Sequence, residues 1–324
     1  MIATVAIAIA AGAASALMFA SIISGALISL VLFNLAPLPL MVAAIGWGPL
    51  TAAIGGVAAA TVCGLLFGMP FAIAFATTAA LPAWWLGHLA LLGRPVPHAA
   101  TDGNGAAPPA HTMEWYPSGR LLLWVAAIAG LLAFMTLLTI GTDAEAIAAA
   151  MKRGFARMVR MFALRGVAID DGVIEAMTSI APAGFPAGPM LMLTGNLWLA
   201  SKIARTSGRL NRPWPDLKAT ALPPMTLVAL CVAIAFCFTG GLLSILAKVV
   251  TGALLTAYAL TGLAVLHTLT LASSNRLVWL VLSYAVTIVL IWPLFIMAVL
   301  GLADAVFGFR ERFMRTRPPP LPAA

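Results

Sequence analysis

The chain has 324 residues, of which 62% are hydrophobic and 9% are charged, and its formal net charge is +8. Because an ordinary soluble domain carries roughly 25% charged residues, this composition excludes a soluble globular protein. No Asp, Glu, Lys or Arg precedes Arg94. Several later runs exceed the roughly 20 apolar residues that cross a bilayer. The composition therefore predicts an all-α protein with several membrane spans.

The positive charge is placed in the loops between the expected spans and in the C-terminal tail. Retention on the cytoplasmic side and attraction to anionic lipid explain this placement, so we expect membrane lipids as partners and no nucleic acid. The three cysteines, Cys63, Cys231 and Cys237, lie in apolar stretches, and their spacing matches neither a disulfide framework nor a zinc site. We expect no metal and no cofactor.

Residues 1–92 are expected to form a charge-free N-terminal helical bundle. Its expected spans occupy residues 2–33, 49–67 and 70–92. Pro37 and Pro39 interrupt the helix after the first span, because each proline removes a hydrogen-bond donor and clashes with the preceding turn. The apolar piece that follows, residues 40–47, is either a half-span or the end of one kinked span over residues 22–47.

Residues 93–119 are rich in Gly, Pro, Asp and Asn, which is typical of a flexible extramembrane loop. A second set of spans is expected over residues 120–303, followed by a basic, Pro-rich tail over residues 304–324. The expected spans of this set occupy residues 120–141, 183–201, 223–246, 249–273 and 277–303. Together with the N-terminal bundle they predict a polytopic helix bundle of about eight spans, within a range of roughly seven to nine.

An amphipathic insert, residues 142–180, interrupts this second set. Thr142 and Glu145 have the spacing of a capping box, which predicts that a helix begins there. Apolar side chains then recur every three or four residues along one stripe, which comprises Ile147, Met151, Phe155, Met158 and Phe162. The basic residues off this stripe are Lys152, Arg153, Arg157 and Arg160. Such a helix either lies flat on an anionic leaflet, with these four residues facing lipid, or packs on its own protein.

Small residues recur every four positions on two of the expected spans. The first ladder comprises Ala8, Gly12, Ala16 and Ala20, and the second comprises Ala52, Gly56, Ala60, Gly64 and Gly68. Small side chains at this spacing let two helix backbones approach closely, which is how apolar helices associate in lipid. These ladders predict packing surfaces, either for sister helices or for a separate subunit.

Few polar side chains are expected at membrane depth, where each is costly and therefore a candidate for a binding site. Asn34 precedes the proline-broken segment, whose free carbonyls could coordinate a solute, although a helix cap explains it equally. Asn196 lies within an expected span, where it either binds a solute or makes an inter-helix hydrogen bond. His267 is either a ligand or a buried histidine with an ordinary partner.

No motif of an enzyme is found. The sequence lacks Gly-x-Ser-x-Gly, the phosphate-binding Gly-x-x-x-x-Gly-Lys and His-Glu-x-x-His. No acidic residue falls clearly within an expected span, which argues against an ion-coupled carrier. We therefore expect no catalytic residue and no enzymatic activity. Orientation stays open, because the basic residues divide almost evenly between the two faces.

Five elements of the chain occur in an order that is informative. They are Leu38-Pro39-Leu40, the insert 142–180, the span that runs into Lys202–Arg212, Trp214-Pro215, and the motif Gly301-Leu-Ala-Asp304-Ala-Val-Phe307-Gly-Phe309-Arg310. This order resembles the YybS-like family of uncharacterised bacterial multi-pass membrane proteins, over most of the chain. The resemblance implies an architecture and no reaction. We expect the chain in the bacterial inner (cytoplasmic) membrane.

A more distant likeness concerns the N-terminal part alone. Pro39, the pair Gly48-Pro49 and the glycines Gly55, Gly56 and Gly64 look similar to the S components of energy-coupling-factor vitamin transporters. In those proteins small residues on the first helix dock the shared transmembrane subunit. The resemblance implies that Ala8, Gly12, Ala16 and Ala20 dock a second membrane subunit.

Two functions of different class follow. The first is a small-solute-binding transport subunit, with Asn34, Asn196 and His267 as candidate binding residues. The alternative is a non-catalytic membrane scaffold or assembly factor, which the basic amphipathic helix favours.

Overall fold

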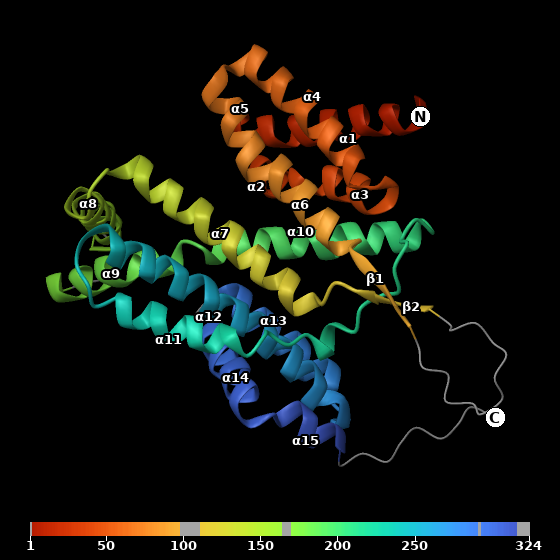
Figure 1. The fold of residues 1–324 in the computed structure, drawn as a ribbon. Coiled ribbons are helices and arrows are strands. Elements are labelled where there is room, and N and C mark those ends of the chain that lie inside the picture. Colours follow the sequence, from red (N-terminus) through yellow and green to blue (C-terminus); the bar gives the residue numbers. More distant parts are fainter. Residues whose placement is uncertain (1, 98–110, 164–169, 291–292, 316–324) are drawn as a thin grey trace. The chain divides into compact units, whose positions relative to one another are not determined.

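The computed structural model describes residues 2–97, 111–163, 170–290 and 293–315 (Figure 1). The chain divides into two units. Unit 1 comprises Met1–Leu121 and Leu191–Pro215, and unit 2 comprises Leu122–Met190 and Asp216–Ala324. The helices α7 (Ser118–Ile140) and α10 (Ala187–Thr206) each contribute to both units.

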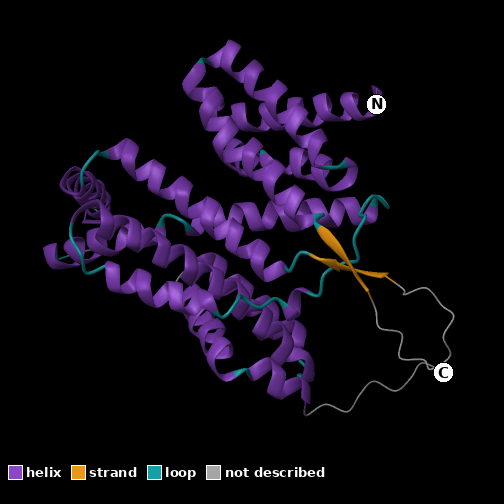
Figure 2. Ribbon diagram, viewed as in Figure 1, coloured by secondary structure: helices purple, strands orange, loops and turns teal. Residues whose placement is uncertain are grey.

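Nearly all of the described chain is helical, with one pair of short strands (Figure 2). The other elements of unit 1 are α1 (Ile2–Ala20), η1 (Ser21–Ser24), α2 (Leu27–Asn34), α3 (Pro37–Trp47), α4 (Pro49–Phe67), α5 (Met69–Phe75), η2 (Ala76–Ala80), α6 (Leu81–Ala90), β1 (Gly93–Pro97) and β2 (His111–Trp115). The other elements of unit 2 are α8 (Ala144–Ala163), α9 (Asp171–Gly184), η3 (Leu217–Ala219), α11 (Met225–Phe236), α12 (Gly241–Leu269), η4 (Thr270–Ala272), α13 (Arg276–Leu290), α14 (Pro293–Phe307) and α15 (Phe309–Arg315).

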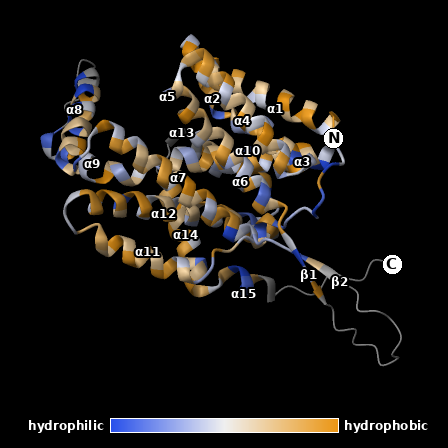
Figure 3. Ribbon diagram, turned by 45° about the horizontal axis from the view of Figure 1, so that its top comes forward, coloured by the Kyte–Doolittle hydropathy of each residue, from blue (hydrophilic) through white to orange (hydrophobic). Residues whose placement is uncertain are grey.

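The fold confirms an all-α polytopic membrane protein. Among the described residues, six helical segments are long and apolar enough to cross a membrane: Ile2–Ser24, Leu27–Trp47, Pro49–Phe67, Met69–Ala90, Ser118–Ile140 and Gly241–Leu269. Three further apolar helices are shorter, at Met225–Phe236, Arg276–Thr287 and Pro293–Phe307. Hydrophobic residues run along these helices, whereas hydrophilic residues gather on α8 and α15 (Figure 3).

The N-terminal spans differ from the expected ones in where they break. The helix expected over residues 2–33 ends at Ser24, because Gly25 adopts a left-handed φ of 66° that reverses the helical path. α2 and α3 then form one span that is kinked at Asn34–Pro37, which decides between the two alternatives for residues 40–47. α4 begins at Pro49 as predicted, after Gly48 with a φ of 101°.

The C-terminal spans are also divided differently. The expected boundary near Lys248 is wrong, because the break falls at Gly240-Gly241, where Gly241 has a φ of 68°. α12 therefore runs through Lys248 for 29 residues, and α11 is only 12 residues long. Pro293 begins a new helix inside the expected span 277–303. The expected span 183–201 is divided as well, because residues 183–184 end α9 and α10 begins at Ala187. The glycine, asparagine and basic residues of α10 keep it out of the apolar set.

The loop expected over residues 93–119 has ordered ends. β1 and β2 pair antiparallel, with Gly93 opposite Trp115 and Arg94 opposite Glu114. The Arg94 and Glu114 side chains form an exposed ion pair at 2.7 Å. Residues 98–110 of the expected loop lie outside the described residues, as do residues 164–169 of the insert and 316–324 of the tail.

Unit 1 is held together by helix backbones that approach at small residues. A Cβ on Gly12 of α1 would overlap the carbonyl oxygen of Gly55 on α4, and one on Gly55 would overlap that of Ala8. The buried residues of α1 are Ala8, Gly12, Ser15 and Phe19, whereas Ala16 and Ala20 are half-buried. The contact surface departs from the four-residue ladder because an α-helix turns once every 3.6 residues.

The second ladder packs within the same unit. Gly56 is buried, and a Cβ placed on it would lie 3.0 Å from the Cβ of Ala80 in η2. Gly64 is half-buried, and a Cβ there would lie 3.2 Å from that of Ala72 in α5. The described neighbours of Ala8, Gly12, Gly56 and Gly64 are therefore sister helices.

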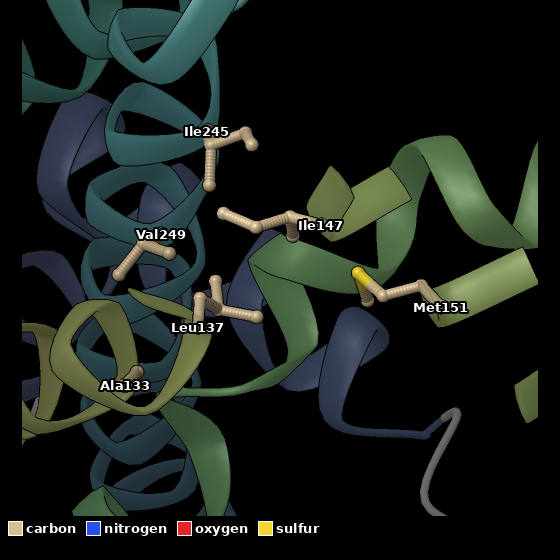
Figure 4. Packing of buried hydrophobic residues seen from close by; sticks show 6 residues of the cluster. All are labelled: Ala133, Leu137, Ile147, Met151, Ile245 and Val249. Atoms are coloured by element: carbon tan, nitrogen blue, oxygen red, sulfur yellow. The ribbon is translucent and has the colours of Figure 1, made fainter. Parts of the chain in front are cut away.

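Unit 2 is built around α12, which packs against α8, α9, α11 and α14. A Cβ on Gly262 would overlap the carbonyl oxygen of Met297, and one on Gly301 of α14 would overlap that of Tyr258. A separate hydrophobic cluster joins α7, α8 and α12 and contains Ala133, Leu137, Ile147, Met151, Ile245 and Val249 (Figure 4).

The α12–α14 contact leaves no room for a larger side chain at Gly262. We expect Gly262→Ala to lower the free energy of unfolding by about 1–3 kcal/mol, because the added methyl forces the two backbones apart. Unfolding of the detergent-solubilised chain measures this. Gly188→Ala is the control, since a Cβ there meets nothing within 4 Å. An equal loss in both variants would contradict the close approach.

Candidate functional site

The proline-broken turn between α2 and α3 is the centre of the predicted binding site. Pro37 and Pro39 have no N–H, and the N–H of Leu38 donates to the carbonyl of Leu35 at 2.9 Å. In a regular α-helix the N–H of Leu38 would instead donate to the carbonyl of Asn34. The carbonyl of Asn34 is therefore free of its helical partner and accepts a hydrogen bond from elsewhere.

Two buried side chains from other helices donate to this turn. Nδ2 of Asn196 on α10 donates to the carbonyl oxygen of Asn34 at 2.8 Å, and Oγ of Ser15 on α1 donates to that of Ala36 at 2.6 Å. Asn196 is 3% exposed and Ser15 is fully buried. Neighbouring side chains thus satisfy the freed carbonyls, as a helix break at membrane depth requires.

The amide orientation of Asn196 is set by its partners. Nδ2 also donates to the carbonyl of Met192 on its own helix, at 2.9 Å. Because both partners are acceptors, the nitrogen must face them and Oδ1 faces the other way. That oxygen is buried and accepts no hydrogen bond among the described residues. The inter-helix hydrogen bond expected as one alternative for Asn196 is therefore present. The Oδ1 atom of the same side chain has no hydrogen-bond donor among the described residues.

Asn34 and His267 do not add donors to this turn. The side chain of Asn34 is exposed, and its Nδ2 donates to the carbonyl of Leu30 one turn earlier, at 2.7 Å. His267 belongs to unit 2, where its Nε2 lies 3.0 Å from Oη of Tyr284. Of the three predicted binding residues, the structure brings Asn34 and Asn196 together, through the backbone of Asn34.

The amphipathic helix α8 begins one residue later than the capping box predicts. Oδ1 of Asp143 accepts from the backbone N–H of Ala146 at 2.7 Å, so Asp143 is the N-cap in place of Thr142. Ile147 and Met151 are buried, and Phe155 packs beside them against α7 and α12. Lys152, Arg153, Arg157 and Arg160 are exposed, and the side chain of Phe162 lies outside the described residues.

A cluster of arginines and tryptophans that the sequence did not predict lies in unit 1. We call it the Arg–Trp cluster; it comprises Trp47, Trp115, Arg205, Arg209, Arg212 and Trp214. Each arginine lies over a different indole. The distance from Cζ to the ring centroid is 5.1 Å for Arg205 and Trp214, 5.2 Å for Arg209 and Trp47, and 5.8 Å for Arg212 and Trp115. The segment's dense arginines were the available signal, but their aromatic partners are distant in sequence.

A buried ion pair in unit 2 was also missed. Asp304 is 6% exposed, and its carboxylate accepts from the backbone N–H and Nε of Arg310 at 2.9 and 2.7 Å. Nη1 of Arg310 donates to the carbonyls of Lys218 and Thr220. This pair ties the C-terminal end of α14 to the segment before α11, which is a structural role for the motif Gly301–Arg310.

Two further observations concern metal ligands and cavities in the described chain. No group of three His, Cys, Asp or Glu side chains in the described ranges could hold a metal ion. An open groove of about 520 Å³ in unit 2 is lined by Leu269, Leu300, Phe309, Arg312 and Phe313. None of the predicted binding residues lines this groove.

The hydrogen bond from Asn196 to the broken turn can be tested by truncation. We expect Asn196→Ala to lower the free energy of unfolding by about 1 kcal/mol, because the freed carbonyl of Asn34 loses its donor. Asn34→Ala is the matched control, since its side chain bonds only its own exposed helix face. Unfolding in detergent measures both variants. A larger loss for Asn34→Ala would contradict this assignment.

Comparisons with known proteins give no relative. No family model matches the chain, no curated protein matches it, and no solved structure matches it. The resemblance to the YybS-like family stays a prediction, and so does the likeness to S components. Function is therefore argued from the residues of this chain alone.

Proposed function

We propose that this multi-pass membrane protein is a non-catalytic scaffold, whose helix α8 presents a basic surface to an acidic, membrane-associated partner protein. The observation that carries the proposal is the packing of α8. Its apolar residues Ile147 and Met151 pack against α7 and α12 of the same unit (Figure 4). Its four basic residues are exposed.

This packing favours a protein partner over a flat membrane position. A helix that lies on a leaflet buries its apolar face in the acyl boundary and keeps its basic face at the headgroups. The first apolar residues of α8, Ile147 and Met151, already pack in one cluster with Leu137 of α7 and with Ile245 and Val249 of α12. Packing against the bundle also fixes the basic residues in space, and a fixed charge pattern selects partners better than a mobile one.

The charge pattern supports the same proposal. Lys152, Arg153, Arg157 and Arg160 lie on a helix whose acidic residue, Glu145, is in the first turn. None of the four forms an ion pair with a carboxylate among the described residues. Their charge is therefore available to an acidic surface. The proposal includes a location in the bacterial inner membrane.

Site-specific photo-crosslinking in cells tests the scaffold proposal. A photo-reactive residue replaces Gly154, which is exposed and has open space around it. We expect a discrete protein adduct that disappears in Arg153→Glu/Arg157→Glu/Arg160→Glu, because charge reversal repels an acidic partner. The matched control is Lys202→Glu/Arg205→Glu/Arg209→Glu in unit 1, which makes the same charge change and should retain the adduct.

Two outcomes would contradict the scaffold. One is an adduct with lipid alone. The other is a protein adduct that survives reversal on α8, because the partner would then not depend on the basic surface. Normal elution of each purified variant on size-exclusion chromatography establishes that a lost adduct does not reflect misfolding.

A small-solute-binding transport subunit is the second candidate, and one observation favours it. Oδ1 of Asn196 is buried beside a broken helix and has no donor among the described residues, and an unsatisfied buried acceptor is costly. A solute with an N–H or O–H group would supply that donor. This candidate predicts a polar small molecule that co-purifies with the wild-type chain and is lost in Asn196→Ala. Mass spectrometry of the extracted protein measures it, and no loss would count against it.

A further inference from the structure

We propose that Arg205 and Arg209 in the Arg–Trp cluster bind the phosphate group of an anionic phospholipid at the cytoplasmic leaflet. This inference concerns unit 1 and does not rest on the scaffold proposal, which concerns α8 of unit 2.

The end of α10 fixes where these two arginines lie. Gly208 has a φ of 65°, its N–H donates to the carbonyl of Arg205 at 3.1 Å, and the N–H of Arg209 donates to that of Ala204 at 2.8 Å. These two bonds form a Schellman motif, which ends the helix and turns the chain sharply. Arg205 thus stays on the last turn of the helix while Arg209 starts the loop beyond it.

The tryptophans orient the guanidinium groups without using their hydrogen-bond donors. Arg205 lies over Trp214 of the same loop, and Arg209 lies over Trp47 at the end of α3. A cation–π contact with a ring face involves the charge of the guanidinium and supplies no acceptor oxygen to its five N–H donors. Within the described chain neither guanidinium forms an ion pair with a carboxylate, and both side chains are exposed. Their N–H donors are therefore available for contacts with a phosphate.

Arg212 positions the loop and is not part of the proposed contact. Its Nη1 donates to the carbonyl of Ala90 at the end of α6, at 2.8 Å, and its guanidinium lies over Trp115 of β2. Burial lowers the pKa of the Arg212 guanidinium from its ordinary value, because desolvation disfavours the charged form. This partly buried side chain ties the loop to the ends of two other elements.

The positive charge at this end is not balanced. The described acidic residue of unit 1 is Glu114, and its carboxylate already pairs with Arg94. An anion is therefore the chemical class that the cluster favours.

The topology of unit 1 places the cluster at a membrane surface. Arg209 lies over Trp47 and Arg212 donates to the carbonyl of Ala90, so the turn at Trp47–Pro49 and the end of α6 lie at one end of the unit. The turns at Ser24–Leu27 and Phe67–Met69, at the opposite end, contain no charged residue. All described charged residues of unit 1 follow α6 or lie near the end of α10. Within unit 1 the described basic residues gather at this end, so the proposal places it on the cytoplasmic side, and the tryptophans beside it match the headgroup level.

A phospholipid fits this position better than a free phosphate ion. The headgroup phosphates of the bilayer lie at the level where spans end, and their local concentration is far above that of soluble phosphate. Trp198, which is 44% exposed on the last turns of α10 beneath Lys202, offers an apolar surface beside the site. Acyl chains can pack there while the headgroup meets the arginines.

Native mass spectrometry of the full chain in mild detergent tests the proposal, with phosphatidylglycerol as the probe and phosphatidylcholine as the neutral lipid. We expect preferential binding of phosphatidylglycerol and at least a tenfold weaker affinity in Arg205→Gln/Arg209→Gln. The control Arg120→Gln/Arg312→Gln removes the same charge from two exposed positions outside the Arg–Trp cluster and outside α8, and should bind like the wild type. Arg209→Gln alone should give a smaller loss in the same direction.

Three results would overturn the proposal. They are equal affinity for the two lipids, an equal loss in the control variant, and displacement of phosphatidylglycerol by millimolar inorganic phosphate, which would assign the site to a soluble ion. Melting temperature and size-exclusion elution establish that each variant is folded.

The sidedness is measured separately. Ser207 is exposed beside the cluster, so we expect Ser207→Cys to react with a membrane-impermeant maleimide only after the cells are opened. The background carries Cys63→Ala, Cys231→Ser and Cys237→Ser. Labelling in intact cells would overturn the cytoplasmic assignment.

Discussion

A helix that bends inside a membrane must find new partners for the backbone groups that the bend releases, because lipid offers none. In unit 1 the N–H of Leu38, between Pro37 and Pro39, donates to Leu35, so the carbonyl of Asn34 lacks its helical partner. Asn196 and Ser15 then donate to the carbonyls of this turn. The kink therefore fixes α1, α10 and the α2–α3 span to one another. Asn196, a candidate ligand-binding residue, thus donates a hydrogen bond that stabilises the kinked span.

Close approach of helix backbones is the second condition on which the units depend. Hydrophobic burial gives little preference between a helix and a lipid tail, so association relies on packing at small residues. Gly12 against Gly55 in unit 1 and Gly262 against Met297 in unit 2 leave no space for a Cβ. Such contacts bring pairs of helix backbones into direct contact in each unit.

Two groups of basic residues, one on α8 and one near the end of α10, are the basis of the two proposals. In α8 the apolar residues Ile147 and Met151 pack against the bundle, and the scaffold proposal uses the exposed basic residues that remain. In the Arg–Trp cluster Arg205 and Arg209 contact indole rings, and the lipid proposal uses their N–H donors. In both units one part of a basic group makes a packing contact within the unit while another part stays exposed.

Composition and local pattern determined that this is an all-α polytopic membrane protein, where α4 begins and which face of α8 is apolar, because these depend on hydropathy, helical period and proline. They did not determine the breaks at Gly25 and Gly241, since a glycine is compatible with both helix and turn until its φ is fixed by packing. Tertiary structure alone decided that Asn196 donates to the carbonyl of Asn34, 162 positions earlier, and that Arg209 lies over the ring of Trp47. Such pairs leave no local signal, because two side chains distant in sequence meet only after the helices that carry them have packed.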